Sequence, residues 1–296
     1  MNNPMMAEGL DLRVLSPFEE GFAVALRAPE DAVLLDLDGR LLDLHGAAFR
    51  WILPFRDGQA QCCRADGTLG HLDLQGVFHA EPESEEWRLR HELVRLAHLV
   101  YERHYNASID GNLSTRLPDG NFLITPSGLH NGFIRADQLV VMAPDGSTAR
   151  GPGRASSERI LHLEVYRTRP DIGAVIHSHA PCAIAASLAG IDLMEMVISM
   201  APVPTAEYAQ PSSPESAERM RPFLQGYDWG ILPRHGVVCL GHTPWDAFLR
   251  LEGLEHYAHI ALMAHSTGRP ITPLGEEQRR RLLDFWGLGE RGEARQ

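Results

Sequence analysis

Positive charge is scarce in this chain. Its 296 residues carry 27 Lys plus Arg against 39 Asp plus Glu, which gives a formal net charge of −12. Binding to nucleic acid or to an anionic membrane surface requires clustered cations that neutralise phosphate groups. We therefore expect neither kind of partner. A small anionic substrate is still possible, because a few backbone N–H groups and hydroxyls are enough to bind one.

Long apolar runs and cysteine pairs are also missing. No stretch approaches the 18 or so consecutive apolar residues of a membrane-spanning helix. The N-terminus lacks a basic segment followed by an apolar one, the pattern of a secretory signal. The four cysteines form no C-x-x-C motif and no disulfide framework. These absences predict a cytoplasmic protein whose cysteines are reduced thiols.

The sequence pattern changes near residue 83 from short strand-like segments to helical spacing. We find no internal repeat in the sequence. Residues 1–82 read as a β-rich extension of unknown role, with short strands expected at 22–26, 33–37 and 41–44. Asp-Gly turns separate some of these segments, and an acidic stretch at 81–86 marks the junction. Residues 83–296 are expected to form the second domain.

Helical patterns dominate this second part. Ser84 is a good N-cap for a first helix, Pro181 and Gly190 bracket another, and Thr243 precedes a long one. Further helices are expected at 156–169 and after Gly275, with short strands at 122–124, 139–141 and 173–176 between them. The mixture predicts an α/β fold: a layered α/β/α sandwich around a largely antiparallel sheet.

Two histidines one residue apart, His177 and His179, follow the apolar run 174–176. Alternate side chains of an extended backbone point the same way, so both imidazoles can face one ion. Catalytic zinc sites typically have three protein ligands and an open position. His235, at the edge of another β-branched run, is the best-placed third ligand. The remaining histidines, His162 among them, have no partner at better ligand spacing.

Three turns rich in hydrogen-bond donors precede these histidines. They are 111–114 (Gly-Asn-Leu-Ser), 125–128 (Thr-Pro-Ser-Gly) and 156–158 (Ser-Ser-Glu), and the last opens a helix. Free N–H groups at a helix start favour an anion, so the three turns together could bind one phosphate without clustered lysines. Glu158, next to such an anion and a dication, would transfer protons.

In this order and spacing, the motifs resemble the class II aldolase/adducin family over roughly residues 86–270. The resemblance implies that His177, His179 and His235 bind Zn²⁺ or another divalent ion such as Fe²⁺, Mn²⁺ or Co²⁺. It implies that Glu158 is the catalytic base and not a ligand, and that Tyr208 donates a proton in a neighbouring subunit's site, so that the enzyme is a homotetramer. The residues implied to bind substrate or phosphate are Asn112, Ser114, Thr125, Gly128, Ser156 and Ser157.

Three functions compete on this basis. The leading hypothesis is a metal-dependent lyase that makes or cleaves a C–C bond through an enediolate, most simply a sugar-phosphate aldolase of the ketose-1-phosphate type. The second is a metal-dependent decarboxylase or iron-dependent oxygenase acting on a hydroxy or keto acid. The third is a non-catalytic, adducin-like module, which the three histidines disfavour because the adducin branch has lost them. The acceptor and the native metal stay open.

Overall fold

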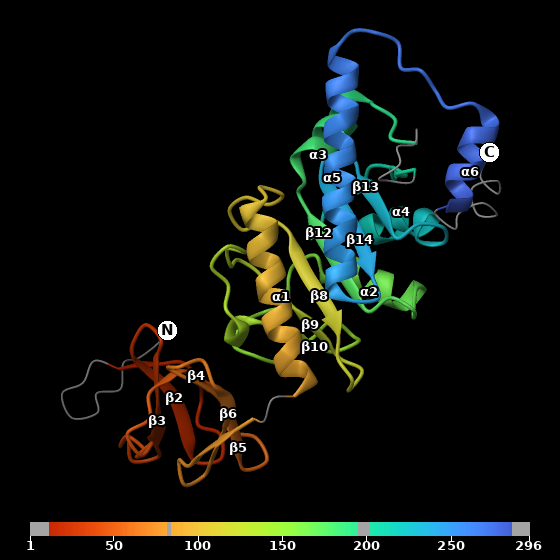
Figure 1. The fold of residues 1–296 in the computed structure, drawn as a ribbon. Helices are drawn as coiled ribbons and strands as arrows, with labels where there is room; N and C mark the ends of the chain where they lie inside the picture. The colour runs from red at the N-terminus through yellow and green to blue at the C-terminus, as the bar shows by residue number, and fades with distance from the viewer. Residues whose placement is uncertain (1–11, 82–83, 195–201, 286–296) are drawn as a thin grey trace.

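In the part of the chain that the structure describes, two antiparallel β-sheets are accompanied by six α-helices. Figure 1 shows their arrangement. The computed structural model describes residues 12–81, 84–194 and 202–285. Each sheet has seven strands, and every pair of neighbouring strands is antiparallel. The expected α/β class is therefore confirmed for these residues at the level of a mixed fold with antiparallel sheets.

The first sheet is a meander in which each strand pairs with the next one along the chain. Its strands are β1 (Arg13–Val14), β2 (Phe22–Ala28), β3 (Asp31–Asp36), β4 (Phe49–Ile52), β5 (Gln59–Arg64), β6 (Leu69–Asp73) and β7 (Phe78–Ala80). It buries its own apolar cluster, which includes Leu34, Phe49, Phe55 and Leu72. This cluster is separate from the larger core that surrounds the second sheet.

The strand expected at 41–44 was wrong. Leu41 makes only an isolated bridge with Leu35, and the next strand begins at Phe49. Asp43 accepts a hydrogen bond from the backbone N–H of His45 at 2.8 Å, and His45 and Gly46 both have positive φ. An aspartate that bonds the backbone two residues ahead favours a turn over an extended chain.

The second sheet has the order β11-β10-β9-β8-β12-β14-β13. Its strands are β8 (Asn112–Arg116), β9 (Phe122–Ile124), β10 (Val140–Met142), β11 (Thr148–Arg150), β12 (Ala174–Ser178), β13 (Trp229–Leu232) and β14 (Gly236–Gly241). Strand β12 therefore lies between β8 and β14, with partners on both sides. All five of its residues are buried, as an interior strand covered on both faces requires.

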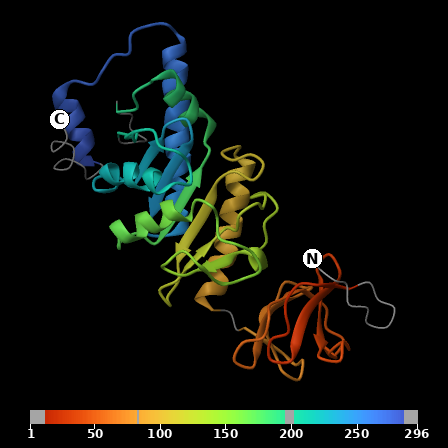
Figure 2. The ribbon, with the colours of Figure 1, turned by 180° about the vertical axis from the view of Figure 1, so that it is seen from behind.

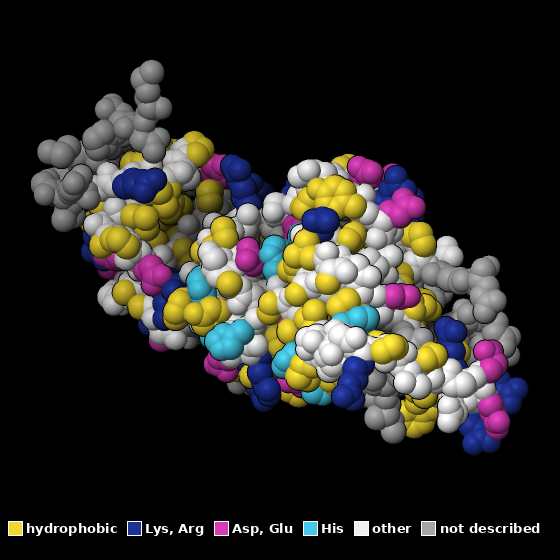
Figure 3. All heavy atoms as spheres, turned by 90° about the horizontal axis from the view of Figure 1, so that it is seen from above, with side chains coloured by type: hydrophobic (Ala, Val, Ile, Leu, Met, Phe, Trp, Pro, Cys, Tyr) yellow, Lys and Arg dark blue, Asp and Glu magenta, His cyan; other side chains and the backbone are white. Residues whose placement is uncertain are grey.

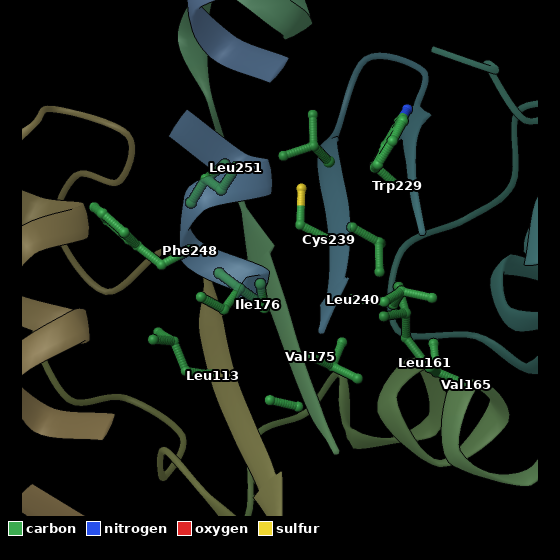
Figure 4. Close-up of a cluster of buried hydrophobic side chains, with 14 of the residues drawn as sticks. Leu113, Leu161, Val165, Val175, Ile176, Trp229, Cys239, Leu240, Phe248 and Leu251 are labelled. Carbon is green, nitrogen blue, oxygen red and sulfur yellow. The ribbon is translucent and has the colours of Figure 1, made fainter. Parts of the chain in front are cut away.

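Helices cover both faces of this sheet. They are α1 (Glu85–Glu102), α2 (Arg159–Thr168), α3 (Pro181–Ala189), α4 (Pro214–Leu224), α5 (Pro244–Ser266) and α6 (Glu276–Phe285), besides a 3₁₀ turn η1 (Ala136–Gln138). Figure 4 shows neighbouring strand residues pointing in opposite directions: Val175 points toward Val165 of α2, whereas Ile176 points toward Phe248 of α5. The period of two thus buries both faces.

The helix boundaries follow their capping residues. Ser84 accepts a hydrogen bond from the N–H of Trp87, and Thr243 forms a reciprocal capping box with Asp246. Pro181 is the first residue of α3, and Gly190 ends that helix with φ +67°. Within the described ranges, none of these helices is both long and apolar enough to span a bilayer.

The first sheet lies beside the lower end of α1 in both Figure 1 and Figure 2. Ion pairs join it to η1 and the residue before it. Arg50 of β4 reaches Asp137 at 3.3 Å, and Glu30 reaches Arg135 at 2.7 Å. Asp137 also contacts Arg135 at 3.2 Å and is only 2% exposed.

Candidate metal and acid–base site

Three histidines meet at one end of the second sheet. His177 is on β12, His179 follows it in the chain, and His235 lies in the turn between β13 and β14. Their ring centroids are 4.6–5.1 Å apart. One donor atom from each ring and one oxygen of Glu158 all lie within 4.8 Å of one another. Among the described residues, this is the one such group of three or more His, Cys, Asp or Glu side chains.

The hydrogen bonds of these rings leave nitrogens that suit an ion. His177 Nδ1 is 2.9 Å from the carbonyl oxygen of Val237, so Nδ1 carries the proton and donates it. Its Nε2 therefore has a free lone pair, the arrangement found in most metal-binding histidines. The Nε2 atoms of His177 and His179 are buried and have no hydrogen-bond partner. Buried polar atoms are rarely left unpaired, so His179 Nε2 favours an ion as its missing partner, whereas His177 Nε2 faces the carboxylate of Glu158 at 2.9 Å.

Glu158 lies among the three rings and not apart from them. Its carboxylate oxygens are 2.9 Å from His177 Nε2 and 3.1 Å from His235 Nε2. It is the N-cap residue of α2, yet its side chain makes no capping hydrogen bond. The carboxylate is thus directed to the histidines. The expectation that Glu158 is not a ligand stays a prediction, and its oxygens are as close to the group as a fourth ligand would be.

The charges of the site act on one another. Burial alone would raise the pKa of Glu158, but the positive charge of His177 and hydrogen bonds from His177 and His235 hold it below its ordinary value. Burial lowers the pKa of His179 to about 4, and the charge of His177 adds to this. The lowered pKa of Glu158 favours an ionised carboxylate, and the lowered pKa of His179 favours a neutral imidazole. Metal binding requires both of these states.

Close backbone packing fixes the two loops that carry the histidines. A Cβ atom on Gly236 would lie 2.3 Å from the carbonyl oxygen of Ser178, so β14 can approach β12 here only with glycine. Asn106 holds the other side, because its Oδ1 accepts hydrogen bonds from Ser178 Oγ at 3.0 Å and from the N–H of His179 at 2.9 Å. A Cβ atom on Gly111, which has φ +70°, would collide with this amide.

The residues expected to bind substrate divide into two groups. Ser157 and Gly128 are exposed, and Ser157 lines a cavity of about 400 Å³ together with Ser127, Arg154 and Arg159. Asn112, Ser114, Thr125 and Ser156 are buried. Ser156 Oγ accepts the N–H of Glu158 at 3.2 Å, and Thr125 Oγ1 accepts the N–H of Leu113 at 3.1 Å.

Asn112 and Ser114 point to α2, where they meet a residue that was not expected in the site. His162 is fully buried between them. It lies one helical turn after Glu158, and Asn112 and Ser114 are two residues apart on a strand. A spacing of four places Glu158 and His162 on one helix face, and a spacing of two places Asn112 and Ser114 on one strand face. Both spacings are visible in the sequence and could have identified His162 as a neighbour of the site. Arg154 and Arg159 were also missed, because single arginines carry no pattern.

Tyr208 is 59% exposed and is not part of the four-residue group. Residues 195–201, a few positions before it, lie outside the described residues. His256 and His259 are exposed on α5 and are likewise not part of the group.

Known proteins share the sheet and the site region of this chain. The family described as Class II Aldolase and Adducin N-terminal domain matches residues 91–262. L-fuculose phosphate aldolase of Methanocaldococcus jannaschii is 33% identical over 176 residues, which cover 58% of this chain and 94% of that protein. 3-Oxo-tetronate 4-phosphate decarboxylase of Escherichia coli K12 is 33% identical over 195 residues, covering 63% and 91%.

A solved structure agrees with these sequence matches. That of an L-fuculose 1-phosphate aldolase superposes with a TM-score of 0.61 at 27% identity, covering 68% of this chain and 96% of its own. The family match includes Glu158, His177, His179 and His235 and extends over more than half of the chain. The chain therefore belongs to the class II aldolase/adducin family.

Proposed function

We propose that this protein is a divalent-metal-dependent lyase that makes or cleaves a C–C bond of a phosphorylated ketose through an enediolate, as an aldolase does. The observation that carries the proposal is the group formed by Glu158, His177, His179 and His235, in which the buried Nε2 atom of His179 has no hydrogen-bond partner. The three histidines would hold the ion. A divalent ion bound there supplies positive charge that stabilises an oxyanion developing on the substrate carbonyl.

The amino-acid composition supports a metal-based route. All 27 basic residues other than histidine are arginines, and the sequence contains no lysine. An aldolase without a metal activates its carbonyl substrate as a Schiff base with a lysine amine. This chain cannot form that Schiff base through a side chain, and the site offers imidazoles and a carboxylate in its place.

Glu158 would move the proton. Its carboxylate is buried, receives a hydrogen bond from Asn112 at 3.1 Å, and is held ionised by its histidine neighbours. An ionised carboxylate can accept a proton from the carbon or hydroxyl next to a carbonyl and return it after the C–C bond has changed. Tyr208 would donate a proton to the leaving or attacking oxygen in the site of an adjacent subunit of a homotetramer.

The anionic end of the substrate has a place near the start of α2. The cavity beside Ser157 is lined by Arg154 and Arg159 and by the hydroxyls of Ser127, Ser147 and Thr148. Two guanidinium groups and hydroxyls bind phosphate well. We propose that the phosphate group of the substrate is bound by Ser156, Ser157, Thr125 and Gly128. Asn112 would then lie between this phosphate and Glu158. Figure 3 shows arginines scattered over the visible face, with no broad basic stripe on that face.

The division of the chain is part of the proposal. Residues 83–296 would be a layered α/β/α catalytic domain, and residues 1–82 an accessory domain. The apolar clusters of the N-terminal sheet are separate from the core around the second sheet, and the family match begins at residue 91. Both observations support this division. We propose the cytoplasm as the location.

Decarboxylation of a phosphorylated 3-oxo acid is the second candidate. It is favoured by the match to the 3-oxo-tetronate 4-phosphate decarboxylase. That match covers 91% of the decarboxylase, and the match to the aldolase covers 94% of the aldolase. Loss of CO₂ from a 3-oxo acid also leaves an enolate, so the same donors would stabilise it.

Product analysis separates the two candidates. The purified protein is stripped with a chelator, its metal content is measured, and activity is assayed with Zn²⁺, Mn²⁺, Fe²⁺ or Co²⁺ restored. We expect one ion per chain and aldehyde release from a ketose 1-phosphate only in the loaded protein. CO₂ release from 3-oxo acid phosphates without aldehyde formation would select the second candidate. A chain that binds no divalent ion would refute both.

A further inference from the structure

A buried chain of hydrogen bonds leads away from Glu158 into the core between β8 and α2. Asn112 Nδ2 is 3.1 Å from Glu158 Oε2, and Asn112 Oδ1 contacts His162 Nε2. His162 Nδ1 is 2.6 Å from Ser114 Oγ, which is 2.7 Å from the hydroxyl of Tyr166. Every member is at most 8% exposed. Nothing in the proposed chemistry so far uses His162, Ser114 or Tyr166.

Repeat distances explain why these side chains meet. Asn112, Ser114 and Arg116 share one face of β8, about 7 Å apart. Glu158, His162 and Tyr166 share one face of α2, about 6 Å apart. The two spacings are close enough to keep the rows in register, and Arg116 ends the row over the ring of Tyr166, 4.7 Å from its centroid. One imidazole therefore spans the gap between two alternate strand residues.

Donor and acceptor counting gives this chain one direction. Asn112 Nδ2 is the amide atom that faces Glu158 Oε2, so Asn112 donates from its NH₂ group to the carboxyl oxygen. The amide oxygen of Asn112 then accepts from His162, which places the histidine proton on Nε2. His162 Nδ1 must accept from the Ser114 hydroxyl, and Ser114 in turn accepts from Tyr166. Each hydrogen bond therefore has one fixed donor and one fixed acceptor. Reversing any one of them would leave two donors or two acceptors facing each other.

The charge of His162 agrees with this order. Burial lowers its pKa to about 3, and the charge of His177 contributes to the same effect. A neutral ring has one donor and one acceptor, as the chain requires. Burial also raises the pKa of Tyr166 above its ordinary value, so its hydroxyl keeps its proton.

We infer that His162 and Ser114 are positioning residues that act on Glu158 through the Asn112 amide. They hold the amide in the orientation that donates to the carboxylate, and Tyr166 completes the chain. This inference rests on the proposed role of Glu158. It also withdraws Ser114 from the expected phosphate-binding residues, because its hydroxyl is fully buried and both its hydrogen bonds are used inside the protein.

Two variants at position 162 test the direction of the chain. Gln can place an amide N–H near the position of His162 Nε2, whereas Leu offers no donor. We expect His162→Leu to lower kcat about 10–100-fold, the usual effect of removing a supporting hydrogen bond around a metal site. His162→Gln should restore kcat to within a few-fold of the wild type. His98→Leu is the matched control, since His98 is part-buried on α1 and its Nε2 hydrogen-bonds to the carbonyl oxygen of Ile134, away from Glu158.

Crystal structures of the metal-free variants supply a readout that does not depend on activity. In His162→Leu the Asn112 amide should turn away from Glu158 Oε2, and in His162→Gln it should stay within hydrogen-bond distance. An unchanged Asn112–Glu158 contact in His162→Leu would overturn the inference. This measurement remains valid if the protein proves not to be an aldolase, so failure of the proposed function is distinguished by an inactive wild type.

Ser114→Ala separates positioning from phosphate binding. The melting temperature is measured with increasing inorganic phosphate, which stabilises a protein that binds it in the folded state. We expect the same phosphate-dependent shift as in the wild type, an unchanged KM for the phosphorylated substrate and a lowered kcat. A lost phosphate shift or a raised KM with unchanged kcat would return Ser114 to the anion site and refute its positioning role.

Discussion

The chemistry of this protein depends on which nitrogen of each imidazole is free. In His177, the proton donated to the Val237 carbonyl leaves Nε2 without a proton, and in His162 the contacts with Asn112 and Ser114 place the proton on Nε2. The first arrangement suits a ligand, and the second suits a support for the carboxylate. The buried histidines His177 and His162 thus carry their protons on different ring nitrogens, and the hydrogen-bond partners of each ring determine which one.

Replacing His177 by Ala removes a ligand with a free lone pair at the centre of the group. We expect the bound metal to fall from one ion per chain towards zero, measured by elemental analysis, with a native far-UV circular dichroism spectrum. His256→Ala, at an exposed position on α5, is the control and should keep its ion. Full metal retention by His177→Ala would refute the ligand assignment.

Glu158→Gln keeps the size of the side chain and removes its charge. Three imidazoles remain, so the metal should stay, while turnover should fall about 10²–10⁴-fold, the usual contribution of a general base. Metal content and kcat are measured on the same preparation. Loss of metal with unchanged turnover per bound ion would show that the carboxylate is a ligand and not the base.

At the scale of elements, the site depends on how closely β14 approaches β12. The sequence predicted the β12 segment and the helices α3 and α5 with their caps, because Pro181, Gly190 and Thr243 are local signals. For β14 it showed only a β-branched run next to His235. It also predicted three of the four members of the site as ligands. The Asn112–His162–Ser114 contacts could not be predicted by inspection of single motifs, since they join residues about 50 positions apart through the pairing of one strand and one helix.

A methyl group on Gly236 would press on the Ser178 carbonyl and on the ring of His177. We expect Gly236→Ala to lower the free energy of unfolding by about 1–3 kcal/mol, the usual range for overpacking, and to weaken metal binding. Gly275→Ala is the matched control, because the nearest atom is the end of the flexible Gln278 side chain, 3.4 Å away. Both are followed by urea unfolding. Equal stabilities would show that the strands can separate without cost.

The ion pair between α2 and α4 gives a stability that depends on pH. Burial would raise the pKa of Glu164, but the hydrogen bond from Arg221 and the charges of Arg167 and Arg221 lower it below the ordinary glutamate value of about 4.3. A lowered pKa stabilises the fold above the unfolded pKa, and this contribution is lost as the pH falls through the folded one.

We therefore expect Glu164→Gln to be less stable than the wild type at neutral pH, with a difference that shrinks below about pH 4. Thermal unfolding across this pH range measures the difference. A gap between the two proteins that stayed constant from pH 7 down to pH 3 would exclude the ion pair as its source.

At the scale of the whole molecule, the β-rich N-terminal sheet is joined to the family domain by charges. Asp137 bridges Arg50 and Arg135 and is almost fully buried, whereas Glu30 is 52% exposed at its side chain. The composition indicated two parts, but nothing local in the sequence could pair Arg50 with a residue 87 positions later. Contacts of that separation come from tertiary packing.

Burial decides which of these charges contributes to stability. Asp137→Asn leaves two arginines without their shared carboxylate and should cost about 1–3 kcal/mol of unfolding free energy. Glu30→Gln removes an exposed partner and should cost less than about 1 kcal/mol. Chemical denaturation of both variants compares them directly. A larger loss for Glu30→Gln would contradict the burial-based ranking.

The position of β12 between two partner strands has a consequence for motion. Its amides are hydrogen-bonded on both sides, so they should exchange with deuterated solvent only when the whole sheet opens. Glu158, in contrast, is at the end of a helix, where amides exchange through local fraying. The strand that carries His177 should therefore exchange its amides more slowly than the start of α2, next to Glu158.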